Sequence, residues 1–227
     1  MDIVYSLSDI VSSQLVYSLR SLQNMPHGSV FFVGGKPMWA KNIIHIPTEQ
    51  YETKWKNVPR NLIEVCKDQR VSEDFIYMND DFFILERVRE PMRELNLYNG
   101  TVRETLGRIQ RKTPYIEGME QTYKLLKELG KEEPLNYELH IPCVFNKDNF
   151  LKMFEIEGVN DIEVLHYRSL YGNLYRTVGK DSLDVKITQR SGFKGKPIKF
   201  LSCSNDGFEL LEQFLDHRFP NQCPYEI

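Results

Sequence analysis

The sequence lacks any hydrophobic run that approaches the ~20 residues needed to cross a membrane as a helix. Its first residues carry the acid Asp2 and no basic cluster, so they do not resemble a secretory signal peptide. The composition of the 227 residues, 41% hydrophobic and 27% charged, excludes collagen, a low-complexity chain and a disulfide scaffold. We therefore expect a globular protein of the cytoplasm with no membrane span.

Several motifs of common enzyme and metal-binding classes are also absent. The four cysteines, Cys66, Cys143, Cys203 and Cys223, are widely spaced and form no Cys-x-x-Cys pair, which argues against a zinc site and favours free thiols in a reducing compartment. The sequence contains no Gly-x-x-x-x-Gly-Lys-Ser/Thr, Gly-x-Gly-x-x-Gly or Gly-x-Ser-x-Gly motif. These absences count against a P-loop enzyme, a dinucleotide oxidoreductase and an α/β-hydrolase.

The net charge of −3 hides an uneven distribution. Residues 87–112 hold seven basic residues against three acidic ones, and residues 186–199 hold five basic residues and no acid. Such segments are either solvated faces balanced by acids elsewhere in space or contacts for an anionic partner.

Apolar runs and helical spacing predict an alternation of strands and helices. Helices are expected at about 12–24, 59–70, 101–112, 115–129, 146–154 and 209–219, and strands at 2–6, 29–33, 43–46, 74–85, 137–141, 185–187 and 198–202, with a helical or mixed segment at 165–175. Thr101 and Glu104 form a capping-box pattern, and Gly130 is expected to close the helix before it.

The early strands are continuous apolar runs, as a sheet covered on both faces requires. We therefore expect an α/β fold with a mostly parallel central sheet flanked by helices. The whole chain, residues 1–227, is predicted to form one domain with a helical insertion at about 86–135.

Asn79, Asp80 and Asp81 interrupt the apolar strand at 74–85. Burying two adjacent carboxylates is costly unless something compensates them. One solution is that the strand ends there, because ligands of an α/β sheet bind at the carboxyl ends of its strands, and a divalent cation bound to carboxylates also binds substrate phosphates. The alternative is a surface turn that joins two strands.

Three further polar residues follow apolar segments. His140 precedes Pro142 at the end of an expected strand and is either a core residue or part of the crevice. Asn205 and Asp206 follow the strand at 198–202, although the next residue, a glycine, also favours a turn. Arg168 lies among apolar and aromatic residues and could bind a phosphate with two hydrogen bonds or form an ordinary salt bridge.

Taken together, these blocks resemble the Stealth family of capsular polysaccharide phosphotransferases, which is related to the GlcNAc-1-phosphotransferases, and more widely the GT-A nucleotide-sugar transferases. The most specific block is residues 72–83, SEDFIYMNDDFF. The others are 15–22 (LVYSLRSL), 31–33 (FFV), 36–39 (KPMW), 140–142 (HIP), 205–206 (ND), 219–220 (FP) and 225–226 (YE). The resemblance implies a GT-A-like fold and a metal-dependent transferase that uses a nucleoside-diphosphate sugar, most simply a UDP-sugar.

The resemblance also implies roles for individual residues. Asp80, Asp81 and His140 are expected to hold Mn²⁺ or Mg²⁺, or in the case of His140 the diphosphate. The nucleotide-sugar is expected to contact six residues: Tyr5, Ser6, Arg60, Asn79, Asp80 and Arg168. Asp81, His140 and Asp206 are the candidate catalytic residues, with Asp206 as the base or as the group that orients the acceptor.

Two blocks of the family are reduced here. Residues 2–9, DIVYSLSD, lack the tryptophan and the acid-glycine stretch of the family's opening, and residues 57–64, NVPRNLIE, replace a longer motif. We therefore expect transfer of the sugar itself, with transfer of a sugar 1-phosphate or a non-catalytic sugar-nucleotide binding module as alternatives.

The acceptor is expected to be a carbohydrate, or else a hydroxylated base in DNA. The DNA alternative depends on basic residues in the two segments described above. Arg108, Arg111 and Lys112 share one face of an expected helix, and the loop that contains Arg190, Lys194 and Lys196 is basic and rich in glycine. An enzyme of this kind would flip the base into its crevice.

Overall fold

The computed structural model describes residues 1–10, 12–50, 53–109, 111–193 and 199–227. The strands are β1 (Asp2–Leu7), β2 (Val30–Gly34), β3 (Ile44–Ile46), β4 (Asp74–Met78), β5 (Phe82–Ile84), β6 (Leu97–Tyr98), β7 (Cys143–Asn146), β8 (Lys180–Asp181), β9 (Lys186–Ile187) and β10 (Phe200–Cys203). The α-helices are α1 (Gln14–Ser21), α2 (Lys54–Lys67), α3 (Pro91–Glu94), α4 (Val102–Arg108), α5 (Pro114–Glu128), α6 (Lys147–Met153), α7 (Tyr167–Tyr175), α8 (Asn205–Phe208) and α9 (Glu212–Arg218). Two 3₁₀ helices, Leu22–Asn24 and Val159–Asp161, complete the described elements.

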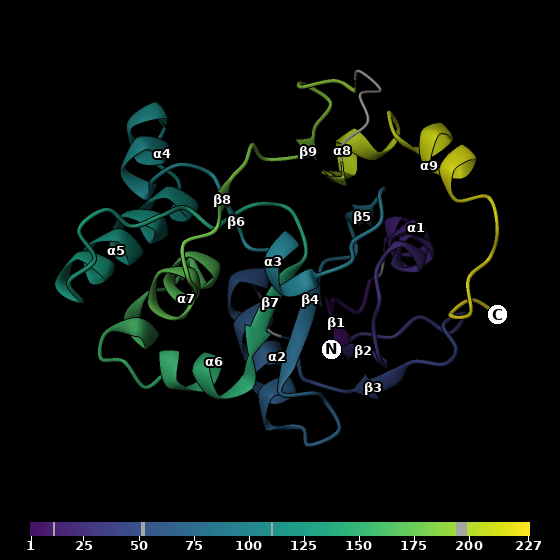
Figure 1. Cartoon of the computed structure of the whole chain (residues 1–227), viewed down its shortest axis with the longest axis horizontal. Helices are drawn as coiled ribbons and strands as arrows, with labels where there is room; N and C mark the ends of the chain where they lie inside the picture. Colours follow the sequence, from purple (N-terminus) through teal and green to yellow (C-terminus); the bar gives the residue numbers. More distant parts are fainter. Residues whose placement is uncertain (11, 51–52, 110, 194–198) are drawn as a thin grey trace.

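A five-stranded sheet in the order β3-β2-β1-β4-β7 forms the centre of the molecule. The first four of these strands run parallel, and β7 pairs antiparallel with β4 at the edge. This arrangement confirms the expected α/β fold with a mostly parallel central sheet. Figure 1 shows α4, α5, α6 and α7 gathered on one side of this sheet, and α1, α8 and α9 toward the other.

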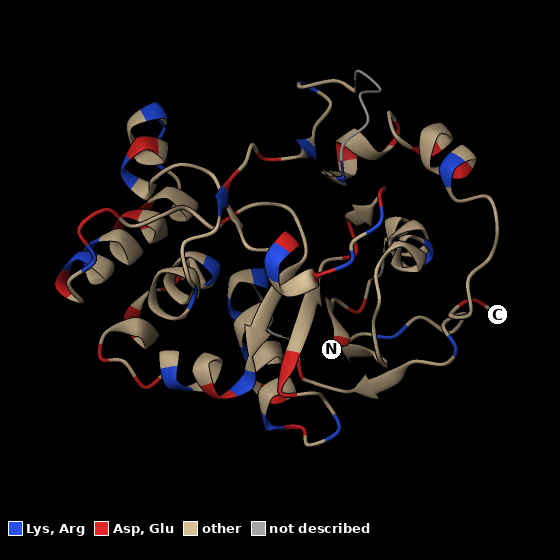
Figure 2. Ribbon diagram, in the orientation of Figure 1, with Lys and Arg blue, Asp and Glu red and all other residues tan. Residues whose placement is uncertain are grey.

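The two faces of the central sheet bury separate clusters of side chains. On β1, Ile3 and Tyr5 point toward the cluster that contains α1, whereas Val4 between them points toward the cluster that contains α2. This alternation follows from the two-residue period of a strand. Because both faces are covered, the strands can be almost wholly apolar, and Figure 2 shows that charged residues lie mainly on the outer helices and loops.

A second sheet, in the order β5-β10-β9, follows the end of β4. β5 pairs antiparallel with β10, which pairs parallel with β9. Phe83 and Leu201 of this sheet pack with Leu211 and Leu215 from the C-terminal helical region. The short turn 79–81 therefore connects two sheets, and the chain passes from the first sheet to the second at the two aspartates.

The helical region between residues 86 and 135 contains α3, α4 and α5 together with β6. The capping box predicted for α4 is present, because the Thr101 side chain accepts a hydrogen bond from the backbone of Glu104 and the Glu104 side chain accepts one from the backbone of Thr101. Gly130 follows α5 with φ of +81°, the left-handed conformation that ends many helices.

The prediction of a strand at 137–141 is wrong, because these residues form no strand in the structure. Tyr137, Leu139 and Ile141 are buried in alternation, which produced the strand-like pattern. Their segment instead bonds to side chains: the backbone N–H of Tyr137 donates to Ser169 Oγ and that of His140 to Asp184 Oδ1. The strand of this region is β7, which lies further along the chain.

Some helix boundaries also differ from the prediction. Helix α2 begins at Lys54, and Pro59 lies inside it, whereas the sequence pattern placed the start of the helix at this proline. The helix expected at 209–219 corresponds to the shorter helix α9, and a separate short helix, α8, precedes it. In the described part of the chain, none of the helices is both long and apolar enough to cross a membrane.

Candidate active site

A cavity of about 580 Å³ opens at the carboxyl ends of β1 and β4. We call it the strand-end cavity. Ser6 near the end of β1 and Asn79 directly after β4 belong to its lining, and the N-terminal half of α2 forms another wall. This is the place in a parallel α/β sheet where ligands bind, because the loops that leave the strands spread apart there.

Five of the residues that the sequence singled out line this cavity together: Ser6, Asn79, Asp80, His140 and Arg168. They come from four separate parts of the chain. The fold therefore concentrates polar groups of both charges around one space.

Asp80 and Asp81 follow β4 and point to different surroundings. Asp80 lines the strand-end cavity, and burial together with the nearby charge of Asp81 raises the pKa of its carboxyl. Asp81 points toward the second sheet, where its Oδ2 accepts a hydrogen bond of 3.1 Å from Ser202 Oγ and lies 3.6 Å from Lys186 Nζ. The Oδ1 atom of Asp81 is buried and has no hydrogen-bond partner in the described structure.

An unbonded buried carboxylate oxygen is a costly feature that a bound cation would relieve. Asp80 and Asp81 supply hard oxygen ligands of the kind that Mg²⁺ and Mn²⁺ prefer, so these residues fit the expected metal. Within the described ranges, however, no group of three or more His, Cys, Asp or Glu side chains is arranged to hold a metal ion, so His140 does not join the two aspartates as a third ligand. One or two carboxylates are enough where substrate phosphates complete the coordination.

Arg168 is the buried cation of the cavity. Only 6% of the residue is exposed, and it forms no ion pair with a carboxylate of the described residues. Its Nη1 atom donates a hydrogen bond of 2.5 Å to the carbonyl of Leu139, and its guanidinium carbon lies 5.2 Å from the ring centroids of Tyr77 and Phe82. A guanidinium has five N–H donors and stays charged, so Arg168 retains donors for an anion in the cavity.

His140 is held in place by an aspartate that sequence reasoning missed. Its Nδ1 lies 2.7 Å from Asp184 Oδ2, and its backbone N–H donates to Asp184 Oδ1 over 3.0 Å. Burial alone would raise the pKa of Asp184, but the hydrogen bonds and the charge of His140 hold that pKa below its ordinary value. The contact occupies one ring nitrogen and leaves Nε2 for other partners.

Asn61 and Ser6 form a further polar pair at the cavity. Asn61 is buried in α2, where its side-chain Nδ2 donates to Ser6 Oγ over 2.9 Å and its Oδ1 accepts from Thr48 Oγ1 over 2.6 Å. The Ser6 hydroxyl therefore has its acceptor side engaged and its own proton left to donate. Trp55, also on the wall formed by α2, provides an aromatic surface.

The structure does not bring Tyr5, Arg60 or Asp206 to the strand-end cavity. Tyr5 points to the opposite face of β1, because neighbouring strand residues alternate, and its hydroxyl lies 3.0 Å from Ser18 Oγ in the core. Arg60 lies on the exposed side of α2, between cavity-lining neighbours. Asp206 is exposed in the short helix α8, where its side chain contacts Ser204 Oγ.

The basic residues expected to contact the acceptor lie on the surface. Arg108, Arg111 and Arg190 are exposed and do not line the strand-end cavity. Lys194 and Lys196 lie outside the described residues. Figure 2 shows that α4, which ends at Arg108, carries acidic as well as basic residues, so its surface is not uniformly positive.

No protein-family model matches the chain, and no curated protein matches it in sequence. Among solved structures, the chain is similar to the galactosyltransferase LgtC in complex with donor and acceptor sugar analogues, with a TM-score of 0.55 and 9% sequence identity over 98% of this chain and 96% of that one. It is also similar to the active-site mutant Q189E of LgtC, with a TM-score of 0.52 and 10% identity over 96% and 95% of the two chains. The fold of the chain is thus that of the GT-A glycosyltransferases, while the resemblance to the Stealth family stays a prediction.

Proposed function

We propose that this chain is a glycosyltransferase that moves a sugar from a nucleoside-diphosphate sugar, most simply a UDP-sugar, to a hydroxyl group of an acceptor. The observation that carries the proposal is Arg168, a buried cation that has no carboxylate partner among the described residues and lines a cavity at the strand ends. Burying an unpaired charge is unfavourable, and a bound diphosphate would compensate it with charge-assisted hydrogen bonds.

The two aspartates beside the cavity complete this proposal. A divalent cation on Asp80 and Asp81 would supply positive charge to the oxygens of the diphosphate leaving group. Their own contribution is to hold this charge at the end of β4, with Asp81 fixed by its hydrogen bond from Ser202. The fold similarity to the galactosyltransferase LgtC, whose structure holds donor and acceptor sugar analogues, supports glycosyl transfer as the proposed reaction.

In the proposed reaction, the acceptor oxygen forms a bond to the anomeric carbon of the sugar. The bond from that carbon to the diphosphate oxygen breaks, and its electron pair leaves with the nucleoside diphosphate. We assign the proton of the acceptor hydroxyl to His140, because Asp184 engages Nδ1 and leaves Nε2 as the basic atom. Asp206, the other candidate base, is exposed and does not line the strand-end cavity.

We propose a carbohydrate or another small hydroxylated compound as the acceptor in preference to DNA. The DNA alternative depends on basic residues, and those that the structure describes, Arg108, Arg111 and Arg190, lie on exposed surfaces away from the strand-end cavity. A base flipped out of DNA would need phosphate contacts around the mouth of the cavity that receives it.

The test is to identify the products by mass spectrometry after incubation with UDP-glucose, UDP-galactose or UDP-N-acetylglucosamine, Mn²⁺ and a panel of simple glycosides. Release of UDP with a glycosylated acceptor supports the proposal. Release of UMP with a sugar phosphate on the acceptor would establish the Stealth-type reaction instead. Binding of UDP without turnover of any donor would indicate a sugar-nucleotide binding module.

The matched variants are Asp81→Asn and Asp74→Asn. Asp81 follows the carboxyl end of β4, whereas Asp74 is the first residue of this strand, where its carboxylate accepts a hydrogen bond from Asn146. We expect Asp81→Asn to lower turnover by at least about a hundredfold, the scale on which loss of charge stabilisation at a leaving group acts. Asp74→Asn should retain turnover, and equal losses in both variants would contradict the role of Asp81.

A further inference from the structure

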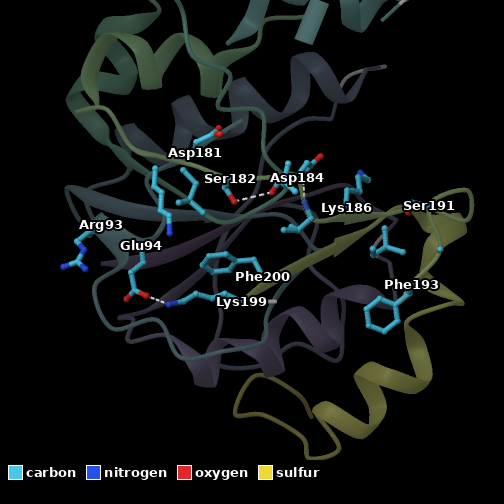
Figure 3. Close-up of a pocket in the computed structure, with 16 residues that line it drawn as sticks. Arg93, Glu94, Asp181, Ser182, Asp184, Lys186, Ser191, Phe193, Lys199 and Phe200 are labelled. Carbon is cyan, nitrogen blue, oxygen red and sulfur yellow. Dashed lines mark hydrogen bonds and ion pairs between the residues drawn. The ribbon is translucent and has the colours of Figure 1, made fainter. Parts of the chain in front are cut away.

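A second cavity, of about 950 Å³, lies beside the segment that contains β8 and β9. We call it the β8–β9 cavity. Residues 180–187 form one wall, α3 and Leu97 form another, and Phe200 at the start of β10 forms its floor. Figure 3 shows the ring of Phe200 in the middle of this space, between the Glu94–Lys199 pair on one side and Lys186 and Phe193 on the other.

The apolar side chains of the β8–β9 cavity are incompletely covered. Leu97, Val185 and Phe193 are half-buried, although each packs against a core cluster. Leu183, on the wall of the cavity, is 81% exposed. Half-exposed apolar side chains gathered in a cavity of this size are typical of a site that binds an apolar part of a small ligand.

The charged groups of the β8–β9 cavity are largely paired. Lys199 forms an ion pair with Glu94, and Lys186 lies 3.6 Å from Asp81 Oδ2. Asp184 is engaged by His140. A cavity whose charges are neutralised in pairs offers little attraction for a polyanion, and it favours a ligand with few charges.

Two contacts join this cavity to the strand-end cavity. Lys186 lines both of them. Asp184 lines the β8–β9 cavity, and its partner His140 lines the strand-end cavity. A ligand in the β8–β9 cavity would therefore meet a donor in the strand-end cavity at the boundary formed by Lys186 and the His140–Asp184 pair.

From this geometry we infer that the β8–β9 cavity binds the acceptor, and that the acceptor is a glycoside whose aglycone is apolar. The inference rests on the proposed function. The sugar hydroxyl of the acceptor faces the boundary at His140 and attacks the anomeric carbon of the donor, whose bond to the diphosphate oxygen breaks. The aglycone packs against Leu97, Val185 and Leu183.

The test compares the binding of methyl and hexyl β-D-glycosides of glucose and galactose, measured by calorimetry below the concentration at which the hexyl compounds form micelles. UDP binding is measured in parallel. The two glycosides of each pair share the same sugar and differ by five methylene groups. We expect the hexyl compound to bind at least about tenfold more tightly, because burying even half of these groups exceeds the 1.4 kcal/mol that corresponds to tenfold.

Leu183→Asn should reduce the hexyl preference and leave UDP binding unchanged. The control is Met38→Asn, which changes a residue that is 96% exposed and lies outside the lining of both cavities. Because both side chains are exposed, both variants should fold. An unchanged hexyl preference in Leu183→Asn, or an equal loss in Met38→Asn, would overturn the inference.

Two further outcomes separate this inference from the proposed function. UDP binding without any hexyl preference would refute the apolar acceptor and leave glycosyl transfer standing. A hexyl preference without UDP binding would refute the proposed function, and the acceptor assignment would fall with it. Displacement of the hexyl glycoside by duplex DNA at ~50 mM salt would also overturn the inference, because it would assign the β8–β9 cavity to nucleic acid.

Discussion

Replacing Arg168 with methionine should separate the stability of this protein from its ability to bind a nucleotide. In the absence of ligand, the change removes the hydrogen bonds to the carbonyl of Leu139 and to the side chains of Tyr77 and Tyr167, together with the contacts with two aromatic rings. These losses amount to about 3–6 kcal/mol. The change also removes a buried charge whose desolvation costs several kcal/mol. We therefore expect the free energy of unfolding to change by no more than about 2 kcal/mol in either direction.

Nucleotide binding should respond much more strongly to this substitution. Hydrogen bonds between a guanidinium and a phosphate contribute about 1.5–3 kcal/mol, so UDP should bind about 10- to 100-fold more weakly to Arg168→Met. At a UDP concentration 100 times the wild-type Kd, the ligand stabilises the wild-type protein by about 2.7 kcal/mol. A 30-fold loss of affinity lowers this stabilisation to about 1 kcal/mol. The UDP-induced rise in Tm should fall from about 5–10 °C to about 2–4 °C.

Arg176→Met is the matched control for this experiment. Arg176 follows the same helix, α7, and its guanidinium also lies over aromatic rings, those of Tyr137, Phe145 and Tyr171. It donates a hydrogen bond to the carbonyl of Val144 and lines a different, smaller cavity. Arg176→Met should lower the Tm and keep the full UDP-induced shift, measured by thermal unfolding with and without UDP. Wild-type UDP affinity in Arg168→Met, or equal losses in both variants, would refute the reasoning.

Other predictions concern stability. Arg20→Met should lower the free energy of unfolding in urea by about 3–5 kcal/mol, because it leaves the Glu226 carboxylate, 8% exposed in its side chain and bonded through both oxygens, without its cation. Burial alone would raise the pKa of Glu226, but the hydrogen bonds from Arg20 hold this pKa below its ordinary value. The stability that this pair contributes should therefore be complete above pH 4.5 and be lost as the pH falls through the pKa of Glu226 in the folded protein. Arg20→Met should flatten this dependence of the unfolding free energy on acid pH. Gly118→Ala should lower the free energy of unfolding by about 1–3 kcal/mol, because the added Cβ would lie 2.0 Å from the carbonyl oxygen of Val164. Gly107→Ala should raise it by up to about 1 kcal/mol in the same assay, because no other atom lies within 4 Å of the added Cβ.

The sequence was sufficient to predict β1 to β4, the parallel strands of the central sheet, because the physical signal there is local. Strands such as β2 are short, wholly buried apolar runs. Asp80 and Asp81 stood out for the same reason, since two acids inside such a run require a change in the chain's surroundings. The structure shows this change as the transition from the first sheet to the second.

The segment 137–141 was mispredicted because burial and backbone pairing are separate properties. Its side chains alternate between buried and less buried positions, as in a strand, but its backbone bonds to Ser169 and Asp184. Both partners come from segments more than 30 residues away, so no pattern within the segment distinguishes the two cases.

Asp184 and Lys186 escaped prediction for a similar reason. Neither belongs to a motif, and both derive their position from the short pairing of β9 with β10. Tyr5 shows the opposite error, since it lies in a recognisable block but on the face of β1 that points into the core. The register of a strand decides which of two neighbours, Tyr5 or Ser6, reaches a cavity.

The features that carry the functional proposal are those that cost folding energy when the protein is considered alone. Among the residues that the structure describes, the buried guanidinium of Arg168 has no carboxylate partner and the Oδ1 atom of Asp81 has no hydrogen bond, and the apolar wall around Leu183 is left open. A sequence under selection for stability alone would remove such features, because satisfied or apolar alternatives exist at each position. A metal diphosphate would compensate the first two, and an apolar aglycone would cover the third. The two cavities share Lys186, so a donor and an acceptor bound together would compensate all three unfavourable features. They would also meet at the boundary where the sugar is to be transferred.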